Sequence, residues 1–248
     1  MKKIMVLFAA AMLLFGFSGQ AMASFAAGDL IQVVYQAGGA SEMATDLGSG
    51  YNFTSAYTGP AVNFTTNPFA TAGTGVFSTA NWGNLNVAYF ISDGTNTNAW
   101  VSGPSTGLTD GARKGPGFNT AAGAVMNAYN ALGTGAQGSM LQSGLSSYYT
   151  RMNSAGLAIG SMSAFIPAGT TEMNLLSLAT PGSYVDQYIY FFGNATASSA
   201  QPGEQVYDIR TFSDGTSEIQ TTPTPVPPSV LLFGTGLLGL VGIRRKLA

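Results

Sequence analysis

The chain has 248 residues, of which 46% are hydrophobic and 8% charged, and its formal net charge is −2. It contains neither cysteine nor histidine, which excludes disulfides, Ser-His-Asp and Cys-His catalysis, and His- or Cys-ligated zinc or haem. Residues 24–222 hold all eleven acidic residues but only four basic ones, a net charge of −7. Because this region lacks a basic surface, no nucleic-acid partner is expected, and no motif indicates a cofactor or metal.

The N-terminus predicts a secretory signal peptide. Lys2 and Lys3 precede an apolar run over 4–17, and small residues then lead to Ala21-Met22-Ala23. This order of basic region, apolar region and Ala-x-Ala site is typical of a cleaved export signal; the alternative is a buried helix of the fold. We predict a signal helix within residues 1–23 and cleavage between Ala23 and Ser24.

The first half of the exported region, 24–222, is predicted to form β-strands. Short runs of apolar, β-branched and aromatic residues alternate with glycine-rich breaks, which is the pattern of strands and turns. The predicted strands cover residues 30–35, 41–47, 62–65, 85–92 and 99–101.

The middle of the region is predicted to form a helical hairpin. Residues 121–132 and 139–152 each carry apolar side chains at helical spacing, and Gly133-Thr134-Gly135 separates them. Asn119 or Thr120 is the expected N-cap of the first helix.

Strand patterns return after Gly160, at residues 163–166, 173–178, 184–192 and 204–212. Strands on both sides of a central helical pair predict a mainly β domain. We expect an antiparallel β-sandwich-like fold with a helical hairpin insertion.

Two sequence repeats have simple structural interpretations. Ser-Asp-Gly-Thr occurs at 92–95 and at 213–216, each time after an aromatic-rich strand, and two hairpin turns are favoured over a repeated ligand loop. Residues 133–138 match G-x-G-x-x-G but follow a predicted helix, whereas a dinucleotide site requires a preceding strand.

Carboxylates are the only strong acid–base candidates, and none is assigned a catalytic role. Asp208, Asp214 and Glu218 lie close in sequence, as do Glu42 and Asp46. A glycan hydrolase would need two of them facing one cleft, so this function remains an alternative.

Aromatic side chains offer a second alternative, a carbohydrate-binding surface module. Trp82 and Tyr57 are the candidate ligand contacts, because amphipathic rings suit sugar faces. Tyr148 is a weaker candidate, and Trp100 is expected in the core.

The C-terminus carries a tripartite tail over residues 223–248. Pro225-Val226-Pro227-Pro228 ends a Thr/Pro stretch, and an uncharged segment over 230–243 leads to the basic cluster Arg244-Arg245-Lys246. The segment predicts a transmembrane helix with the basic residues on the cytoplasmic side. Its apolar anchor positions are Val230, Leu231, Leu232, Leu237, Leu238, Leu240, Val241 and Ile243.

This tail resembles the sorting signal of PEP-CTERM proteins. The resemblance covers residues 223–248 together with the signal peptide, and Val226 stands where the family's Pro-Glu-Pro motif has Glu. It implies recognition by exosortase, a membrane cysteine transpeptidase-like enzyme, and processing near the proline motif. Family members are surface or extracellular-matrix proteins, often linked to exopolysaccharide.

The sequence therefore predicts a non-enzymatic, exported protein of the cell surface or extracellular matrix. Its expected partners are an exosortase-type enzyme, the membrane through the C-terminal helix, and an exopolysaccharide.

Overall fold

A computed structural model describes part of the chain. The described residues are 24–66, 68–69, 77, 79–95, 97–104, 115–153, 162, 171–193 and 203–220. The expected signal peptide, the expected tail and the strand expected at 163–166 lie outside them.

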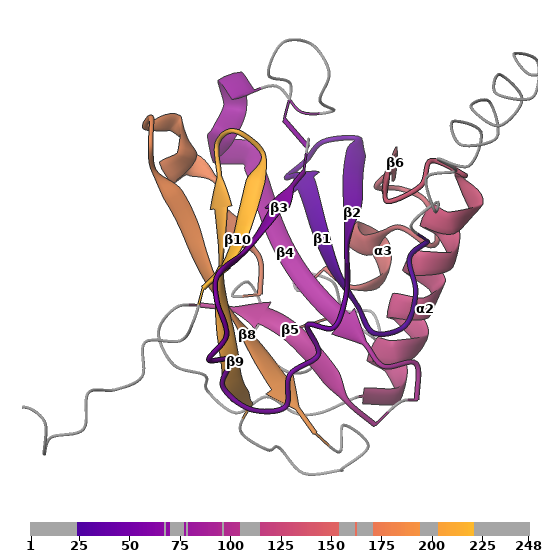
Figure 1. Ribbon diagram of the computed structural model, residues 1–248. Helices are drawn as coiled ribbons and strands as arrows, with labels where there is room; N and C mark the ends of the chain where they lie inside the picture. The colour runs from indigo at the N-terminus through magenta and orange to yellow at the C-terminus, as the bar shows by residue number, and fades with distance from the viewer. Residues whose placement is uncertain are drawn as a thin grey trace, which may run out of the picture.

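One antiparallel sheet dominates the structure and follows the order β3-β10-β9-β8-β5-β4-β1-β2-β6, with β7 paired to β4. Its strands are β1 Asp29–Gln36, β2 Ser41–Ser49, β3 Val62–Thr65, β4 Leu85–Ser92, β5 Ala99–Gly103, β6 Gln137–Leu141, β7 Met173–Asn174, β8 Tyr184–Phe192, β9 Glu204–Phe212 and β10 Thr216–Gln220. The mainly β, antiparallel prediction is confirmed. One continuous, curled sheet (Figure 1) takes the place of the two packed sheets expected of a sandwich.

The curl allows the sheet to bury its own inner face. Alternate residues of β1, β4, β8 and β9 form this inner core, together with the 3-10 helices η1 (Thr79–Asn84) and η3 (Leu176–Ala179). A polar network crosses it, in which Tyr89 Oη lies 2.6 Å from Thr211 Oγ1 and Gln32 Nε2 donates to Ser217 Oγ at 2.9 Å. Side chains from β1 and β10 thus meet across the interior, which a flat sheet would not permit.

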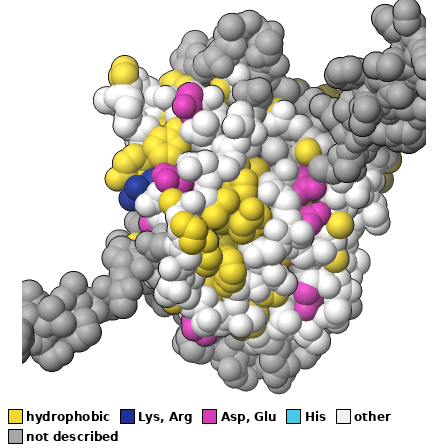
Figure 2. Space-filling view, viewed as in Figure 1, with side chains coloured by type: hydrophobic (Ala, Val, Ile, Leu, Met, Phe, Trp, Pro, Cys, Tyr) yellow, Lys and Arg dark blue, Asp and Glu magenta, His cyan; other side chains and the backbone are white. Residues whose placement is uncertain are grey.

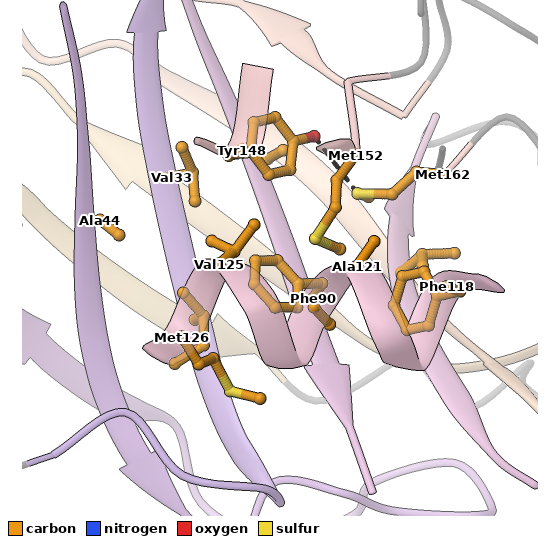
Figure 3. Packing of buried hydrophobic residues seen from close by; sticks show 14 of the residues in the cluster. Val33, Ala44, Phe90, Phe118, Ala121, Val125, Met126, Tyr148, Met152 and Met162 are labelled. Carbon is orange, nitrogen blue, oxygen red and sulfur yellow. Dashed lines mark hydrogen bonds between the residues drawn. The ribbon is translucent and has the colours of Figure 1, made fainter. Parts of the chain in front are cut away.

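Helix α2 (Gly115–Ala131) covers part of the outer face. Figure 3 shows Phe118, Ala121 and Val125 on the helix side that faces the sheet, close to Phe90 of β4. Tyr148, at the start of the short helix α3 (Tyr148–Arg151), is fully buried in the same cluster and donates to Met162 Sδ at 3.2 Å.

The predicted helical hairpin is half correct. Helix α2 begins at Gly115, so Asn119 and Thr120 lie inside it and neither is its N-cap. Within the second predicted helix, residues 139–141 belong to β6, which pairs with β2, and only 148–151 are helical. The edge of β2 offers backbone partners that helical spacing alone does not reveal. The predicted strand at 173–178 likewise divides into β7 and η3.

Glu42 of β2 joins this part of the fold. Its side chain is fully buried, and its carboxylate accepts hydrogen bonds from Tyr129 Oη (2.9 Å), Tyr148 N (2.6 Å) and Tyr149 N (2.8 Å). One carboxylate therefore connects the sheet to α2 and to the first turn of α3.

Candidate functional site

The outer side chains of the last three strands lie beside the part of the sheet that α2 covers, and their exposure ranges from 42% for Tyr184 to 7% for Asp208. Strands β8, β9 and β10 alternate, so that one set of side chains fills the inner core and the other set lies outside. We call this second set the β8–β10 outer face. It consists of Tyr184, Asp186, Tyr188, Asp208, Arg210 and Glu218.

Strand register arranges these side chains in rows. Asp186 lies opposite Arg210, Arg210 opposite Glu218, and Glu218 opposite Asn63 of β3. Arg210 Nε donates to Asp186 Oδ1 at 2.9 Å, and its guanidinium lies 4.4 Å from the centroid of the Tyr184 ring. A charged row is thus combined with an aromatic ring that is 42% exposed.

Asp208 occupies the neighbouring row, opposite Tyr188. Burial raises the pKa of Asp208, and the negative charge of Asp186 adds to the rise while Arg210 opposes it. Its Oδ1 is buried without a hydrogen-bond partner. A carboxyl in this state favours protonation.

The β8–β10 outer face can hydrogen-bond a ligand that carries several hydroxyl groups. Arg210 supplies donors, Asp186 and Glu218 supply acceptors, and Tyr184 offers an exposed ring face at one end of the row. Figure 2 shows hydrophobic, acidic and basic side chains gathered on the left, on the side where Figure 1 places β8 to β10. Among the residues that the structure describes, no group of three or more acidic side chains could hold a metal ion.

The two aromatic residues predicted as ligand contacts do not form a joint site. Trp82 is only 9% exposed and packs edge-on against Phe69, 4.7 Å between ring centroids, so the expectation of an exposed Trp82 is not met. Tyr57 is half-buried, stacks on Phe53 at 4.6 Å and donates from its hydroxyl to Pro60 O at 2.8 Å. Trp100 is buried, as expected, and Tyr148 is buried as well.

The predicted carboxylate groups are divided by the fold. Asp208 and Glu218 share the β8–β10 outer face, whereas Asp214 lies in the β9–β10 turn and accepts from Thr216 N at 2.9 Å. Glu42 serves α3, and Asp46 accepts from Gly48 N at 2.7 Å. Among the described residues, no two acidic side chains face each other across a cleft.

The prediction of two hairpin turns of the same type is met in part: residues 213–215 form a tight turn between β9 and β10, whereas β4 and β5 are separated by the longer segment 93–98. The two sequences share their local Asp-Gly geometry. Asp93 Oδ1 accepts from Thr95 N at 2.9 Å, which matches the bond between Asp214 and Thr216. Gly94 and Gly215 have φ of 72° and 85°, a region that favours glycine. Residues 133–138 follow helix α2 and run into the first two residues of β6, so a helix precedes them and the dinucleotide interpretation has no support.

Sequence reasoning missed Tyr184, Asp186 and Arg210. Residues 184–192 were predicted as a strand, and the alternation of Val185, Gln187 and Ile189 with Tyr184, Asp186 and Tyr188 carries the signal that could have found this face. How much of the set Tyr184, Asp186 and Tyr188 stays exposed depends on how far α2 extends over the sheet, and only the fold shows that extent.

Among the described residues, no helix has the length and apolar content needed to span a membrane. No protein-family model matches the chain, no curated protein matches its sequence, and no solved structure matches its fold.

Proposed function

We propose that this chain is an exported, non-enzymatic protein of the cell surface or extracellular matrix, sorted by its C-terminal tail. The observation that carries the proposal is the pair of end segments. A basic-apolar-Ala-x-Ala start and a proline-apolar-basic end imply the same topology, with the domain outside the cytoplasm.

The ordered start of the domain is compatible with cleavage after Ala23. Asn130 of α2 holds Phe25 through two hydrogen bonds, from Phe25 N to Asn130 Oδ1 and from Asn130 Nδ2 to Phe25 O, both 2.8 Å. Phe25 is buried and Ser24 is exposed. Removal of residues 1–23 therefore keeps this anchor intact.

The proposal is tested by expressing the full chain in a bacterial host with an exosortase and in the same host without one. Intact-mass analysis of the surface and membrane fractions locates both termini. We expect a new C-terminus near Pro225–Pro228 only in the competent host, and a first residue of Ser24 in both.

Two variants sharpen this experiment. Replacing Arg244, Arg245 and Lys246 by Gln removes the charges that hold the tail in position, so processing is expected to fall. Replacing Arg151 by Gln removes an exposed charge of the domain, away from the tail in sequence, and should leave processing unchanged. An intact, membrane-bound tail in both hosts would mean a simple anchor and would end the exosortase part of the proposal.

A second candidate function is carbohydrate binding. The β8–β10 outer face supports it, whereas the buried Trp82 does not. An exposed ring beside a row of donors and acceptors matches the two faces of a sugar, apolar C–H and polar hydroxyl. An exopolysaccharide is the corresponding partner. Glycan hydrolysis has less support, because Asp208, the acid of the β8–β10 outer face whose pKa is raised, has a buried Oδ1 that a substrate cannot touch in this conformation.

A further inference from the structure

Strand β6 lies at one end of the sheet and pairs only with β2 among the described residues. Ala136 O accepts from Asp46 N at 2.7 Å, and Gln142 N donates to Ala40 O at 2.8 Å. Even-numbered residues here thus direct their backbone groups toward β2. Because the direction alternates along a strand, Gln137, Ser139 and Leu141 direct theirs outward. Leu141 O already accepts a hydrogen bond from Gly144 N at 3.0 Å, so the groups open to a second strand centre on Ser139.

This edge lacks the features that usually prevent strand edges from pairing. Such edges commonly carry a Lys, a Pro or a bulge. The residues of β6 are Gln-Gly-Ser-Met-Leu, and its register with β2 is continuous from Gln137 to Leu141. The opposite edge, β3, is only four residues long and lies beside Glu218 of β10.

Exposed apolar side chains are concentrated in and near β6 in the sequence. Six large hydrophobic side chains are exposed among the described residues, and four of them lie between positions 132 and 149. Leu141 is 61% exposed and Leu145 is 81% exposed, and the other two are Leu132 and Tyr149.

The same region is free of charge, in a domain that is strongly acidic. Residues 115–150 contain no Lys, Arg, Asp or Glu, whereas residues 24–222 carry a net charge of −7. Two copies of such a domain repel each other over most of their surfaces. They can approach at this region without placing like charges together.

We propose that two copies of this chain associate through the edge of β6 that no described strand pairs with, in an antiparallel pair that continues the sheet. A symmetric pair places Ser139 opposite Ser139 of the second copy and Gln137 opposite Leu141. Since the outward backbone groups belong to these residues, Ser139 forms the central hydrogen-bonded pair. Leu141, which belongs to β6, then lies within the interface.

A cysteine at the centre of the pair tests the geometry, because the chain has no native cysteine. Hydrogen-bonded partners across an antiparallel pair lie about 5.5 Å apart between Cα atoms, within the range of about 4.4–6.8 Å that a disulfide spans. The full chain carrying Ser139→Cys is expressed with export to an oxidising compartment. Most of it is expected at twice the monomer mass on a non-reducing gel, and at the monomer mass after reduction.

Ser177→Cys, on the exposed surface of η3, is the matched control and should remain monomeric. In the Ser139→Cys background, Leu141→Lys should reduce the dimer at least fivefold, because it places two charges at the pair. Leu176→Lys should not, although Leu176 is 63% exposed and thus comparable to Leu141.

Three results would overturn the proposal. The first is that Ser139→Cys and Ser177→Cys cross-link to the same extent. The second is that Leu141→Lys and Leu176→Lys reduce the amount of dimer equally. The third is the formation of oligomers larger than a dimer without a cross-link at position 139. The last result would indicate head-to-tail pairing of β6 with β3.

Discussion

The Tyr184 ring is contacted by the cation Arg210 and by the ring of Phe212, whose centroid lies 5.9 Å away. Arg210 contacts it from above at 4.4 Å and is itself fixed by Asp186 at 2.9 Å. Both partners of this ion pair are about 30% exposed, so the pair contributes little to folding stability. Its effect is on orientation, because a ring with one face covered by a guanidinium offers only the remaining surface to a ligand.

Truncation of this ring tests the carbohydrate proposal. Tyr184→Ala in the full chain is expected to reduce retention in gels that contain purified bacterial exopolysaccharides roughly tenfold, since it removes the only strongly exposed ring of the face. Affinity electrophoresis against neutral and acidic polysaccharides provides the measurement.

Tyr149→Ala is the control for this test. Tyr149 is 38% exposed, close to Tyr184, but lies on α3. If both variants migrate as the parent does in every gel, the β8–β10 outer face does not bind these glycans.

At the scale of elements, most strands were predicted correctly, whereas the second helix predicted over 139–152 was mostly wrong. The strand expected at 85–92 matches β4, and those at 184–192 and 204–212 match β8 and β9, because their β-branched and aromatic content is high on both faces. Residues 139–141 have apolar side chains at helical spacing, yet β2 draws them into the sheet. The spacing of nearby residues does not reveal such long-range pairing. For the same reason, the order of the strands in the sheet could not be predicted from the sequence.

Two glycines, one in α2 and one in β6, are expected to respond in opposite ways to replacement by alanine. Gly123 lies inside α2, and a Cβ added there would have no atom within 4 Å. Gly123→Ala is expected to stabilise the domain by about 0.5–1 kcal/mol, because alanine is the better helix former. Chemical denaturation followed by circular dichroism measures the change.

Gly138 of β6 should show the opposite sign. A Cβ there would lie 2.8 Å from Thr134 Oγ1 and 3.1 Å from both Leu132 Cδ1 and Tyr129 Cδ1. Gly138→Ala is therefore expected to destabilise the domain by roughly 1–3 kcal/mol through overpacking. Equal effects of the two substitutions would show that α2 does not lie against β6 in this way.

For the whole molecule, buried acids set the dependence of stability on pH. Burial raises the pKa of Asp46 to about 6, although its bond from Gly48 opposes the rise. Burial also raises the pKa values of Asp29, Glu42 and Asp208. The folded state therefore binds more protons than the unfolded state between about pH 4 and pH 6, and folding stability increases as pH falls through this range.

We expect the midpoint of thermal unfolding to be higher at pH 5 than at pH 7.5. Below about pH 4 it should fall again, because Asp93 and Asp214 accept hydrogen bonds that hold their pKa values below the ordinary value; for Asp93 these bonds outweigh the effect of burial. Scanning calorimetry between pH 3 and pH 8 measures the profile.

Asp46→Asn keeps an acceptor for Gly48 N and removes the titrating group. This variant should reduce the gain between pH 7.5 and pH 5 and raise the unfolding midpoint at pH 7.5. A profile identical to that of the parent would show that Asp46 is not the carboxyl responsible.

The pairing of β3 with β10 determines when the fold can be completed. Val62 lies opposite Ile219, which follows it by 157 residues in the chain. Contacts so distant in sequence carry a large loop-closure entropy and slow the folding of β proteins to roughly milliseconds or seconds. A chain that crosses a membrane from its N-terminus cannot close its interior until the last strand emerges. Under the proposed export, the inner surfaces of β1 and β4 remain exposed during that interval and can aggregate. Export should then depend on chaperones outside the cytoplasm more strongly than the final stability of the domain suggests.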